Sequence, residues 1–478
     1  MQTYQNYING TFVEGYENIE VLNPATGQPF ALQAIANSQQ VDDAVQAARK
    51  SFLESNFKNL RPVERGRMVR KMGEYLLSKE QEIAELLTME AGKPLWEAKL
   101  EVQGAARYFE YYGNQAETVE GKSIPLGSDY YDFTVYEPYG VTAHIIPWNY
   151  PLEMTARSVS AALTTGNTCV IKTPELDPIT NRYIALAAEH AGLPQGIVNI
   201  ICGWGHEAGD ALTSHPDVNQ IVFTGSVETG IQVASNAAKN VVPCVLELGG
   251  KSGAIVLPDA DQKNLIDSVR WGIFFGAGQV CSAMSRLIVH ESIHDDVLAQ
   301  VVELAKKIKT GPGHDYPTFG DNMGAMISER QRDRAEGLCQ NAVNEGAKIQ
   351  TGGHKLNNQG FFLEPTIISD VTPQMEIAQT EVFGPVLSVM RYSTEEEALS
   401  IINSTEYGLV GGVFTKDLNK AHRLSQKIRA GQIFINEWFA GGVETPFGGF
   451  GKSGYGREKG REALWNYVQT KNIASKLS

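Results

Sequence analysis

The sequence predicts an α/β protein with two wound parallel sheets and a small separate β element. Between residues 141 and 248, five short apolar runs alternate with amphipathic segments, which is the pattern of a doubly wound sheet with helices on both faces. A second series of this kind begins after Gly250, and an aromatic, β-branched run over 130–136 stands outside both series. We therefore expect a Rossmann-like parallel-sheet domain, a second α/β domain and a short β element.

Each expected element follows from the local spacing of apolar residues. Residues 41–52 and 65–86 carry apolar side chains three and four positions apart, so helices should precede the first sheet. The expected strands of the two sheets are 141–146, 168–171, 197–201, 220–223 and 243–246, then 254–257, 287–290, 386–391, 411–414 and 432–435. The expected helices are 153–163, 180–190, 205–213 and 229–239, then 295–309, 394–403 and 417–429. The predicted domains are 1–119 with 138–248, then 249–466, and a third element of 120–137 with 467–478.

Composition excludes several classes of protein. The chain of 478 residues is 42% hydrophobic and 20% charged, as in an ordinary soluble globular protein. Its 41 basic against 55 acidic residues give a net charge of −14, which argues against a nucleic-acid partner. The five cysteines are scattered, so we expect no disulfide framework, no metal site and a reducing, cytoplasmic location. No signal peptide or membrane span is expected.

Three polar residues in apolar or glycine-rich settings are candidates for catalysis. Cys281 follows a glycine-rich run, Glu247 stands alone in the apolar, glycine-flanked segment 246–251, and Asn149 follows the first strand of the wound sheet. Acyl-type chemistry on a carbonyl needs a nucleophile, a base and a donor for the oxyanion, which these three could supply. The alternatives are an inert buried thiol, an ion-paired structural acid and an amide that caps a turn.

A nucleotide site is a further possibility at two strand ends. Residues 223–230 follow a strand, contain Gly225 and Gly230, and open a helix, where backbone N–H groups and the helix dipole attract phosphate. The standard dinucleotide fingerprint is absent, so a plain tight turn is an equal alternative. Glu175, after another strand, could bind ribose hydroxyls or could be a solvated loop charge.

In combination these segments resemble the aldehyde dehydrogenase superfamily, in its NAD(P)-dependent, hydrolytic and non-CoA-acylating form, over nearly the whole chain. The order and spacing of the motifs make the resemblance specific. The motifs are 147–151, 223–226, 246–251, 278–281, 381–385 and 446–449.

The resemblance implies oxidation of an aldehyde to a carboxylate. Cys281 would attack the aldehyde to form a thiohemiacetal, with Asn149 and the Cys281 backbone N–H holding the oxyanion. Hydride transfer to a nicotinamide would leave a thioester, and water activated by Glu247 would hydrolyse it. Glu458 is implied as part of a proton relay from that base.

The resemblance also implies that NAD is the cofactor, with NADP weaker because Glu175 would repel a 2′-phosphate. Lys172 and Glu175 match positions that hold the adenosine ribose, and Ser226 matches a pyrophosphate contact. Glu381 matches the group that holds the nicotinamide ribose. The remaining positions implied to line the cofactor cleft are Ile146, Trp148, Thr224, Gly225, Glu228, Leu248 and Phe383.

The chain departs from the family pattern at two neighbouring positions. Many members have Lys at Ser158, where it joins Glu458 in the relay, so water or another group would serve here. Many have a large aromatic at Arg157, whereas semialdehyde dehydrogenases use an Arg there for a distal carboxylate. Arg157 is therefore expected to meet either a protein acid, Glu153 or Glu437, or a substrate carboxylate.

The aldehyde itself is left open by the sequence. The resemblance implies that Tyr150, Arg157, Trp438, Phe439 and Phe447 line the substrate site, and two aromatics at the entrance favour an aromatic or bulky aldehyde. A small cationic aldehyde held by Glu437 is an alternative. The expected partners are a small-molecule aldehyde and a second copy of the chain, as a homodimer or homotetramer, with no nucleic acid and no membrane.

Rival classes are set aside by particular residues. A CoA-acylating enzyme of the same fold usually lacks the water-activating acid present here as Glu247. A thiol hydrolase needs a Cys–His pair, and the nearest histidine, His290, lies in a predicted strand with no motif around it. A noncatalytic binding protein would not require Cys281, Glu247 and Asn149 together.

Overall fold

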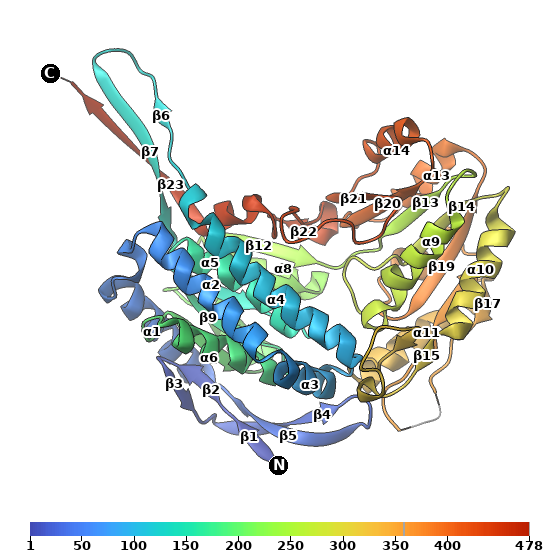
Figure 1. Ribbon diagram of the computed structural model, residues 1–478, viewed down its shortest axis with the longest axis horizontal. Helices are drawn as coiled ribbons and strands as arrows, with labels where there is room; N and C mark the ends of the chain where they lie inside the picture. The colour runs from blue at the N-terminus through green and yellow to red at the C-terminus, as the bar shows by residue number, and fades with distance from the viewer. Residues whose placement is uncertain (357–358, 478) are drawn as a thin grey trace.

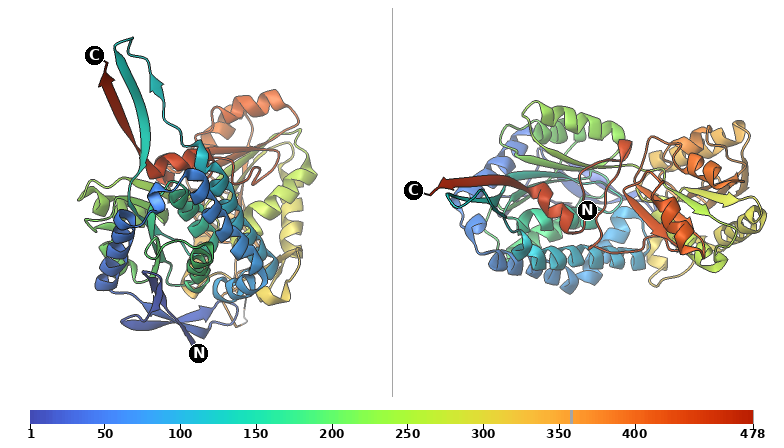
Figure 2. Two further views of the ribbon diagram at one scale, coloured as in Figure 1. Left: turned by 60° about the vertical axis from the view of Figure 1, so that its left-hand side comes forward. Right: turned by 90° about the horizontal axis from the view of Figure 1, so that it is seen from above.

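The computed structural model describes residues 1–356 and 359–477, so Ser478 of the predicted third element lies outside the described residues. Two lobes lie side by side, and an arm of β structure projects from one of them (Figures 1 and 2). Each lobe is built on its own large sheet, and helices cover both faces of it. The predicted α/β fold class is confirmed.

The first lobe contains an eight-stranded sheet in the order β22-β12-β11-β8-β9-β10-β2-β3. Its central strands pair in parallel and match the five predicted ones: β8 (Val141–Ile145), β9 (Thr168–Thr173), β10 (Val198–Cys202), β11 (Gln220–Gly225) and β12 (Cys244–Leu248). The edge strands β2 (Asn6–Ile8), β3 (Thr11–Val13) and β22 (Gly454–Tyr455) were not predicted. Strand β22 comes from the predicted second domain and pairs with β12, with Gly454 opposite Glu247.

Helices of the first lobe pack on both faces of this sheet. The expected helix over 65–86 is two helices, α2 (Pro62–Ser78) and α3 (Glu80–Ala91), separated at Lys79. The N-terminal strands β1 (Gln2–Tyr4), β4 (Glu17–Asn23) and β5 (Gln28–Ile35) form a separate small sheet. The helices and short helical turns are α1 (Ser38–Glu54), η1 (Phe57–Asn59), α2 (Pro62–Ser78), α3 (Glu80–Ala91), α4 (Leu95–Gln115), η2 (Ala116–Thr118), α5 (Pro151–Thr164), η3 (Ile179–Asn181), α6 (Arg182–Ala191), η4 (Gly205–Gly209), α7 (Asp210–Thr213) and α8 (Val227–Ala238).

The second lobe contains a seven-stranded sheet in the order β17-β18-β19-β14-β13-β20-β21. The five predicted strands are present as β13 (Gly253–Val256), β14 (Arg286–His290), β19 (Val386–Tyr392), β20 (Val410–Phe414) and β21 (Gln432–Ile435), with β17 (Lys348–Thr351) and β18 (Thr366–Ser369) added at one edge. Its helices and turns are α9 (Gln262–Val269), η5 (Arg270–Phe274), η6 (Phe275–Gly278), α10 (His294–Lys307), η7 (Gly313–Asp315), α11 (Glu329–Asn344), α12 (Glu376–Gln379), α13 (Glu395–Ile402) and α14 (Leu418–Ser425), and β15 (Lys309–Thr310) pairs with β16 (Asn322–Met323). The later turns η8 (Gly451–Ser453) and η9 (Arg461–Tyr467) pack against β12 and α5 of the first lobe.

The projecting arm is a three-stranded sheet of β6 (Ser123–Ile124), β7 (Tyr130–Pro138) and β23 (Val468–Lys476). Strands β7 and β23 pair antiparallel along their whole length, although they are more than 300 residues apart in the chain. The arm extends beyond both lobes (Figure 1). Its tip exposes apolar side chains: the relative solvent exposure is 66% for Tyr131 and 51% for Leu126.

None of the helices in the described parts of the chain is long and apolar enough to cross a membrane.

Candidate active site

The chain reaches Cys281 through a left-handed turn. Gly276, Ala277 and Gly278 have positive φ angles of 58°, 53° and 69° in succession, a conformation that favours glycine. A Cβ on Gly278 would collide with the backbone of Gly384, so the turn packs directly against the loop that carries Glu381 and Phe383. This close packing fixes the position from which the Cys281 thiol faces the cleft between the lobes.

A cavity of about 320 Å³ opens over the Cys281 thiol. Its lining is rich in aromatic side chains and comes from both lobes. The aromatic lining residues are Tyr108, Tyr150, Trp271, Phe275, Phe439 and Phe447, and the others are Asn149, Glu153, Met154, Arg157, Val280, Ser282 and Lys459. A cavity that joins a thiol to an apolar, aromatic surface suits a small organic molecule with one reactive group.

Glu247 lies beside the thiol at the end of β12. The Cys281 Sγ donates to Glu247 Oε2 at 3.8 Å, and the glutamate is 1% exposed. Its other oxygen, Oε1, has no hydrogen-bond partner in the described chain. Burial raises the pKa of Glu247, and the charge of Arg157 opposes that rise. Burial and the negative charge of Glu247 also hold the pKa of the Cys281 thiol well above its usual value.

Arg157, on α5, joins two buried carboxylates. Its Nε donates to Glu458 Oε2 at 3.0 Å, and its Nη2 lies 3.5 Å from Glu247 Oε2. Nη2 also donates to Thr224 Oγ1 at 3.0 Å. The expectation of a protein acid as the partner is met, but the expected acids, Glu153 and Glu437, were wrong. Sequence spacing could not find Glu458, because it is 301 positions away and reaches α5 only when β22 pairs with β12.

Ser158 points away from this network. Its Oγ lies 2.9 Å from His144 Nδ1, and both residues are buried. Since neighbouring helical residues face different directions, Ser158 cannot take the place of a lysine beside Glu458. In this chain the guanidinium of Arg157, at the preceding position, is the group that contacts Glu458.

Asn149 lines the cavity and is hydrogen-bonded to the loop that carries Cys281. Its side-chain Nδ2 donates to the Gln279 backbone carbonyl at 2.8 Å, and its backbone carbonyl accepts from Lys93 Nζ at 3.0 Å. The amide is thereby fixed in the cavity wall near Cys281.

The predicted cofactor positions lie at the carboxyl ends of the first sheet, where such folds bind nucleotides. Lys172 Nζ donates to Glu175 Oε1 at 3.0 Å after β9. Ser226 caps helix α8 and accepts from Thr229 N at 3.2 Å. Because β11 ends at Gly225, the N-terminus of α8 begins at the carboxyl end of that strand. Across the cleft, Glu381 Oε1 accepts from Gly250 N at 2.9 Å, and burial raises the pKa of Glu381 to about 7.

The other predicted cofactor residues surround the same strand ends. The Trp148 and Phe383 rings meet edge to face at 5.2 Å. Ile146 and Leu248 are buried at the ends of β8 and β12. Thr224, Gly225 and Glu228 lie where β11 passes into α8.

Comparison with known proteins decides the family. The sequence model of the aldehyde dehydrogenase family matches residues 12–473. The chain belongs to the aldehyde dehydrogenase family. An aldehyde dehydrogenase of Aspergillus niger is 40% identical over 98% of this chain and 95% of its own length. Retinal dehydrogenase 2 of Homo sapiens is 40% identical over 96% of this chain and 88% of its own length. The structure of an aldehyde dehydrogenase from Bacillus cereus in complex with NAD+ superposes with a TM-score of 0.97 at 35% identity, covering 100% of this chain and 97% of that chain.

The family and enzyme class predicted from the motifs are thus confirmed. Of the predicted substrate residues of this aldehyde dehydrogenase, Tyr150, Arg157, Phe439 and Phe447 line the cavity. Trp438 does not: it is 3% exposed, and its Nε1 donates to the Ser282 carbonyl at 3.0 Å beneath the cavity. Positive φ at Asn436 and Phe439 turns the loop so that Trp438 enters the core and Phe439 faces the cavity.

Several lining residues of the aldehyde dehydrogenase were missed from sequence. Tyr108, Trp271 and Phe275 lie on helical segments whose apolar faces read as ordinary core. Lys459 follows Glu458 directly, so its place beside a matched motif was the available signal. In the described chain, no three His, Cys, Asp or Glu side chains gather as metal ligands.

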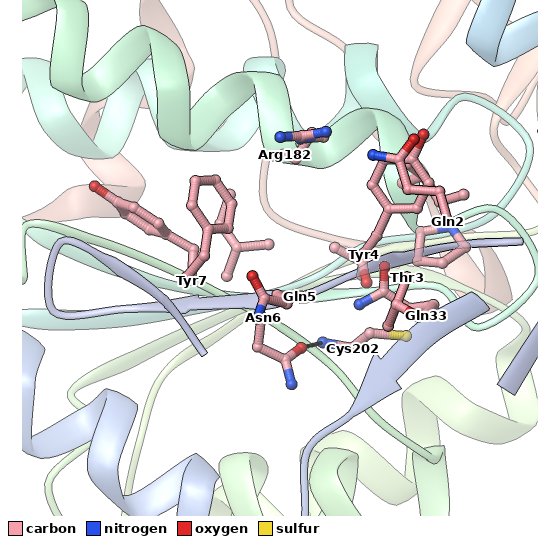
Figure 3. Close-up of a pocket in the computed structure, with 14 residues that line it drawn as sticks. Gln2, Thr3, Tyr4, Gln5, Asn6, Tyr7, Gln33, Arg182 and Cys202 are labelled. Atoms are coloured by element: carbon pink, nitrogen blue, oxygen red, sulfur yellow. Dashed lines mark hydrogen bonds between the residues drawn. The ribbon is translucent and has the colours of Figure 1, made fainter. Parts of the chain in front are cut away.

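A second cavity, of about 190 Å³, lies between the N-terminal strands and α6 (Figure 3). Within it Asn6 Oδ1 accepts from Cys202 N at 2.8 Å, and the Arg182 guanidinium lies 5.3 Å from the centre of the Tyr4 ring. These contacts join β2 and β1 to the first lobe. The cavity shares no lining residue with the one over Cys281.

Proposed function

We propose that this aldehyde dehydrogenase oxidises an aldehyde to a carboxylate with NAD, through a thioester on Cys281. The observation that carries the proposal is the thiol of Cys281 at 3.8 Å from Glu247 Oε2, with Glu247 Oε1 free to accept from a water. A thiol, an adjacent base and a spare acceptor are what a two-step acyl transfer to water requires.

The first step is attack of the Cys281 sulfur on the aldehyde carbon. The Cys281 thiol loses its proton to water in the cavity, the S–C bond forms, and the carbonyl π electrons move to oxygen. The amide of Asn149, fixed by its bond to the Gln279 carbonyl, stabilises that oxyanion; one such donor is typically worth about 10²–10³ in rate. The product is a tetrahedral thiohemiacetal.

The second step is hydrolysis of the thioester left after hydride loss. Glu247 takes a proton from water, the hydroxide attacks the acyl carbon, and the Cys281 thiolate leaves. Arg157 aligns Glu247 through the contact to Oε2, and Glu458 holds Arg157 from the other side. Because a guanidinium does not release its protons, we assign Arg157 and Glu458 to positioning in place of the proton relay expected for Glu458.

NAD fits the strand ends of the first sheet, and when bound it accepts the hydride. Glu175 and Lys172 would hold the adenosine ribose, the N-terminus of α8 with Ser226 the pyrophosphate, and Glu381 the nicotinamide ribose. The ion pair of Lys172 with Glu175 and the phosphate affinity of a helix N-terminus support this fit. The Bacillus cereus relative is an NAD+ complex, which also supports NAD.

The cavity favours an aromatic or bulky aldehyde, because six of its fourteen lining residues are aromatic. The semialdehyde alternative requires Arg157 to bind a distal carboxylate. Its guanidinium is 3% exposed and already bonded to Glu458, Glu247 and Thr224, which disfavours that role. A CoA-acylating reaction is disfavoured by the presence of Glu247 beside the thiol.

The test is NADH absorbance at 340 nm after a panel of aldehydes is added to the enzyme and NAD, with and without CoA. We expect turnover without CoA and the free acid as the product. NADH formation that requires CoA would replace the hydrolytic proposal with the acylating one. No NADH from any aromatic, aliphatic or semialdehyde substrate would overturn the proposal.

A further inference from the structure

Two oppositely charged side chains line the aldehyde cavity without a partner in the described protein. Glu153 lies on α5, one turn before Arg157, and its carboxylate has no hydrogen bond or ion pair there. Lys459 follows Glu458, and its ammonium has no acceptor and lies 5.7 Å from the centre of the Phe447 ring. Both side chains lie on the wall of the cavity that contains the Cys281 thiol.

The neighbouring charged groups are already engaged with one another. Arg157 pairs with Glu458 and Glu247, and Lys93 pairs with Glu101. Partners inside the protein therefore account for the charges of Arg157 and Lys93.

Unpaired charges in a largely apolar cavity are costly, so they are retained where a ligand completes them. Burial and the charge of Glu101 raise the pKa of Glu153 to about 7, and Lys459 opposes this rise. Burial lowers the pKa of Lys459, whereas Glu153 raises it. The two groups thus lie close enough to influence each other, yet no bond joins them.

We propose that Glu153 and Lys459 together recognise a hydroxyl group at the end of the substrate away from its aldehyde, so that hydroxylated aromatic aldehydes are the preferred substrates. This inference rests on the proposed function. A hydroxyl is the neutral group that donates to a carboxylate and accepts from an ammonium. A distal carboxylate would meet the like charge of Glu153, and a distal cation would meet that of Lys459. The rings of Phe275, Phe439 and Phe447 line the same cavity as Glu153, Lys459 and the thiol, and they suit an aromatic body.

The test compares substrates that differ in one group of equal size. We would measure kcat/KM with NAD for 3- and 4-hydroxybenzaldehyde against 3- and 4-methylbenzaldehyde, in wild type, Glu153→Gln and Lys459→Met. Because a hydrogen bond to a charged group is lost, at least one hydroxyl isomer should be preferred about ten- to hundredfold in wild type. The preference should fall severalfold in either variant. Lys306→Met, in an exposed pair with Glu303 on α10, should leave it unchanged.

A second measurement does not depend on turnover. Calorimetric titration of the NAD-loaded enzyme with the unreactive 4-hydroxybenzamide and 4-methylbenzamide, and with their 3-substituted isomers, should give a tighter Kd for the hydroxyl compound. Glu153→Gln should remove that difference. A thermal melt of each variant checks that it is folded.

Several outcomes would overturn the inference. Equal kcat/KM for the hydroxyl and methyl pairs in wild type would do so while leaving aldehyde oxidation intact. A preference for 4-carboxybenzaldehyde that disappears in Lys459→Met would assign Lys459 to a carboxylate. A preference for 4-(trimethylammonio)benzaldehyde that disappears in Glu153→Gln would assign Glu153 to a cation. Absence of NADH from all of these aldehydes would overturn the proposed function together with the inference.

Discussion

Arg157 lies between two buried carboxylates, and its charge sets the chemistry of both. Glu247 and Glu458 are each 1% exposed, and without a cation between them two such charges would be strongly destabilising. The arginine also holds down the pKa of the proposed base. A residue that the sequence placed in the substrate site is therefore better explained as the group that orients Glu247 and opposes the rise of its pKa caused by burial.

Arg157→Leu should shift the pH dependence of hydrolysis. Arg157 lowers the pKa of Glu247, so its removal raises that pKa, and the base stays protonated to higher pH. The acidic limb of the kcat profile should move to higher pH, and the loss of the buried pair should cost about 3–5 kcal/mol of stability. Arg157→Lys keeps the positive charge, so it should shift the acidic limb of the kcat profile by less than Arg157→Leu does. Matched aldehydes with and without a distal carboxylate should be affected equally.

An unchanged acidic limb in a folded Arg157→Leu enzyme would remove Arg157 from control of the base. A KM increase confined to the carboxylated aldehyde would restore the semialdehyde alternative.

Glu175→Ala should relax the preference for NAD over NADP. Glu175 offers two acceptors to the ribose hydroxyls, and a 2′-phosphate would remove one donor and add a like charge. Its pairing with Lys172 leaves a cation nearby, so we expect a preference in wild type and not exclusion of NADP. Comparison of kcat/KM for both cofactors checks this. Equal values in wild type that the substitution does not change would refute the argument.

At the scale of elements, the left-handed turn before Cys281 is where backbone geometry positions the nucleophile. Gly278→Ala should destabilise the protein for two reasons. The φ angle of 69° disfavours a residue with a Cβ, and the new Cβ would collide with the Gly384 backbone. We expect a lower Tm and a lower kcat/KM. Gly192→Ala is the matched control: its φ is 77°, but nothing lies within 4 Å of the added Cβ. It should cost roughly 1 kcal/mol and leave kcat/KM unchanged.

Full activity and an unchanged Tm in Gly278→Ala would mean that the turn does not constrain Cys281.

Elements with strong periodicity could be predicted, and those held by distant contacts could not. The parallel strands of both sheets lie within about three residues of their expected bounds, because buried strands give short apolar runs. Helix α14 ends at Ser425, before the predicted 429, since the following turn bonds Arg429 N to Asn403 Oδ1. Strand β22 is two residues long and exists only through its pairing with β12, so no local pattern could indicate it.

The same distinction holds for the site. Cys281, Glu247 and Asn149 could be found because glycine-rich and apolar surroundings isolate them in the sequence. Their contacts depend on tertiary packing: α5, β12 and the loop after β22 bring Arg157, Glu247 and Glu458 together. A charge pattern in sequence cannot reveal which of several acids an arginine reaches.

At the scale of the whole molecule, the arm of β6, β7 and β23 is too small to fold alone. It projects from the first lobe (Figure 2), and apolar side chains at its tip are exposed. We propose that it pairs with another copy of the chain. Light scattering at micromolar concentration should give a dimer or tetramer. Tyr131→Lys with Leu126→Lys should weaken assembly, because both side chains are more than half exposed in one copy. A monodisperse wild-type monomer would contradict this.

The most direct test of the central claim is intact mass after Glu247→Gln reacts with one aldehyde and NAD. The substitution removes the negative charge that raises the thiol pKa, so attack should continue, whereas hydrolysis loses its base. We expect a burst of about one NADH per subunit and an adduct equal to the aldehyde mass less two hydrogens, which is the thioester. Cys281→Ser should bind NAD and give neither burst nor adduct. An adduct of the full aldehyde mass, or a stalled enzyme with no adduct and no burst, would contradict the account, because Glu247 would then be needed to activate the thiol and not only the water.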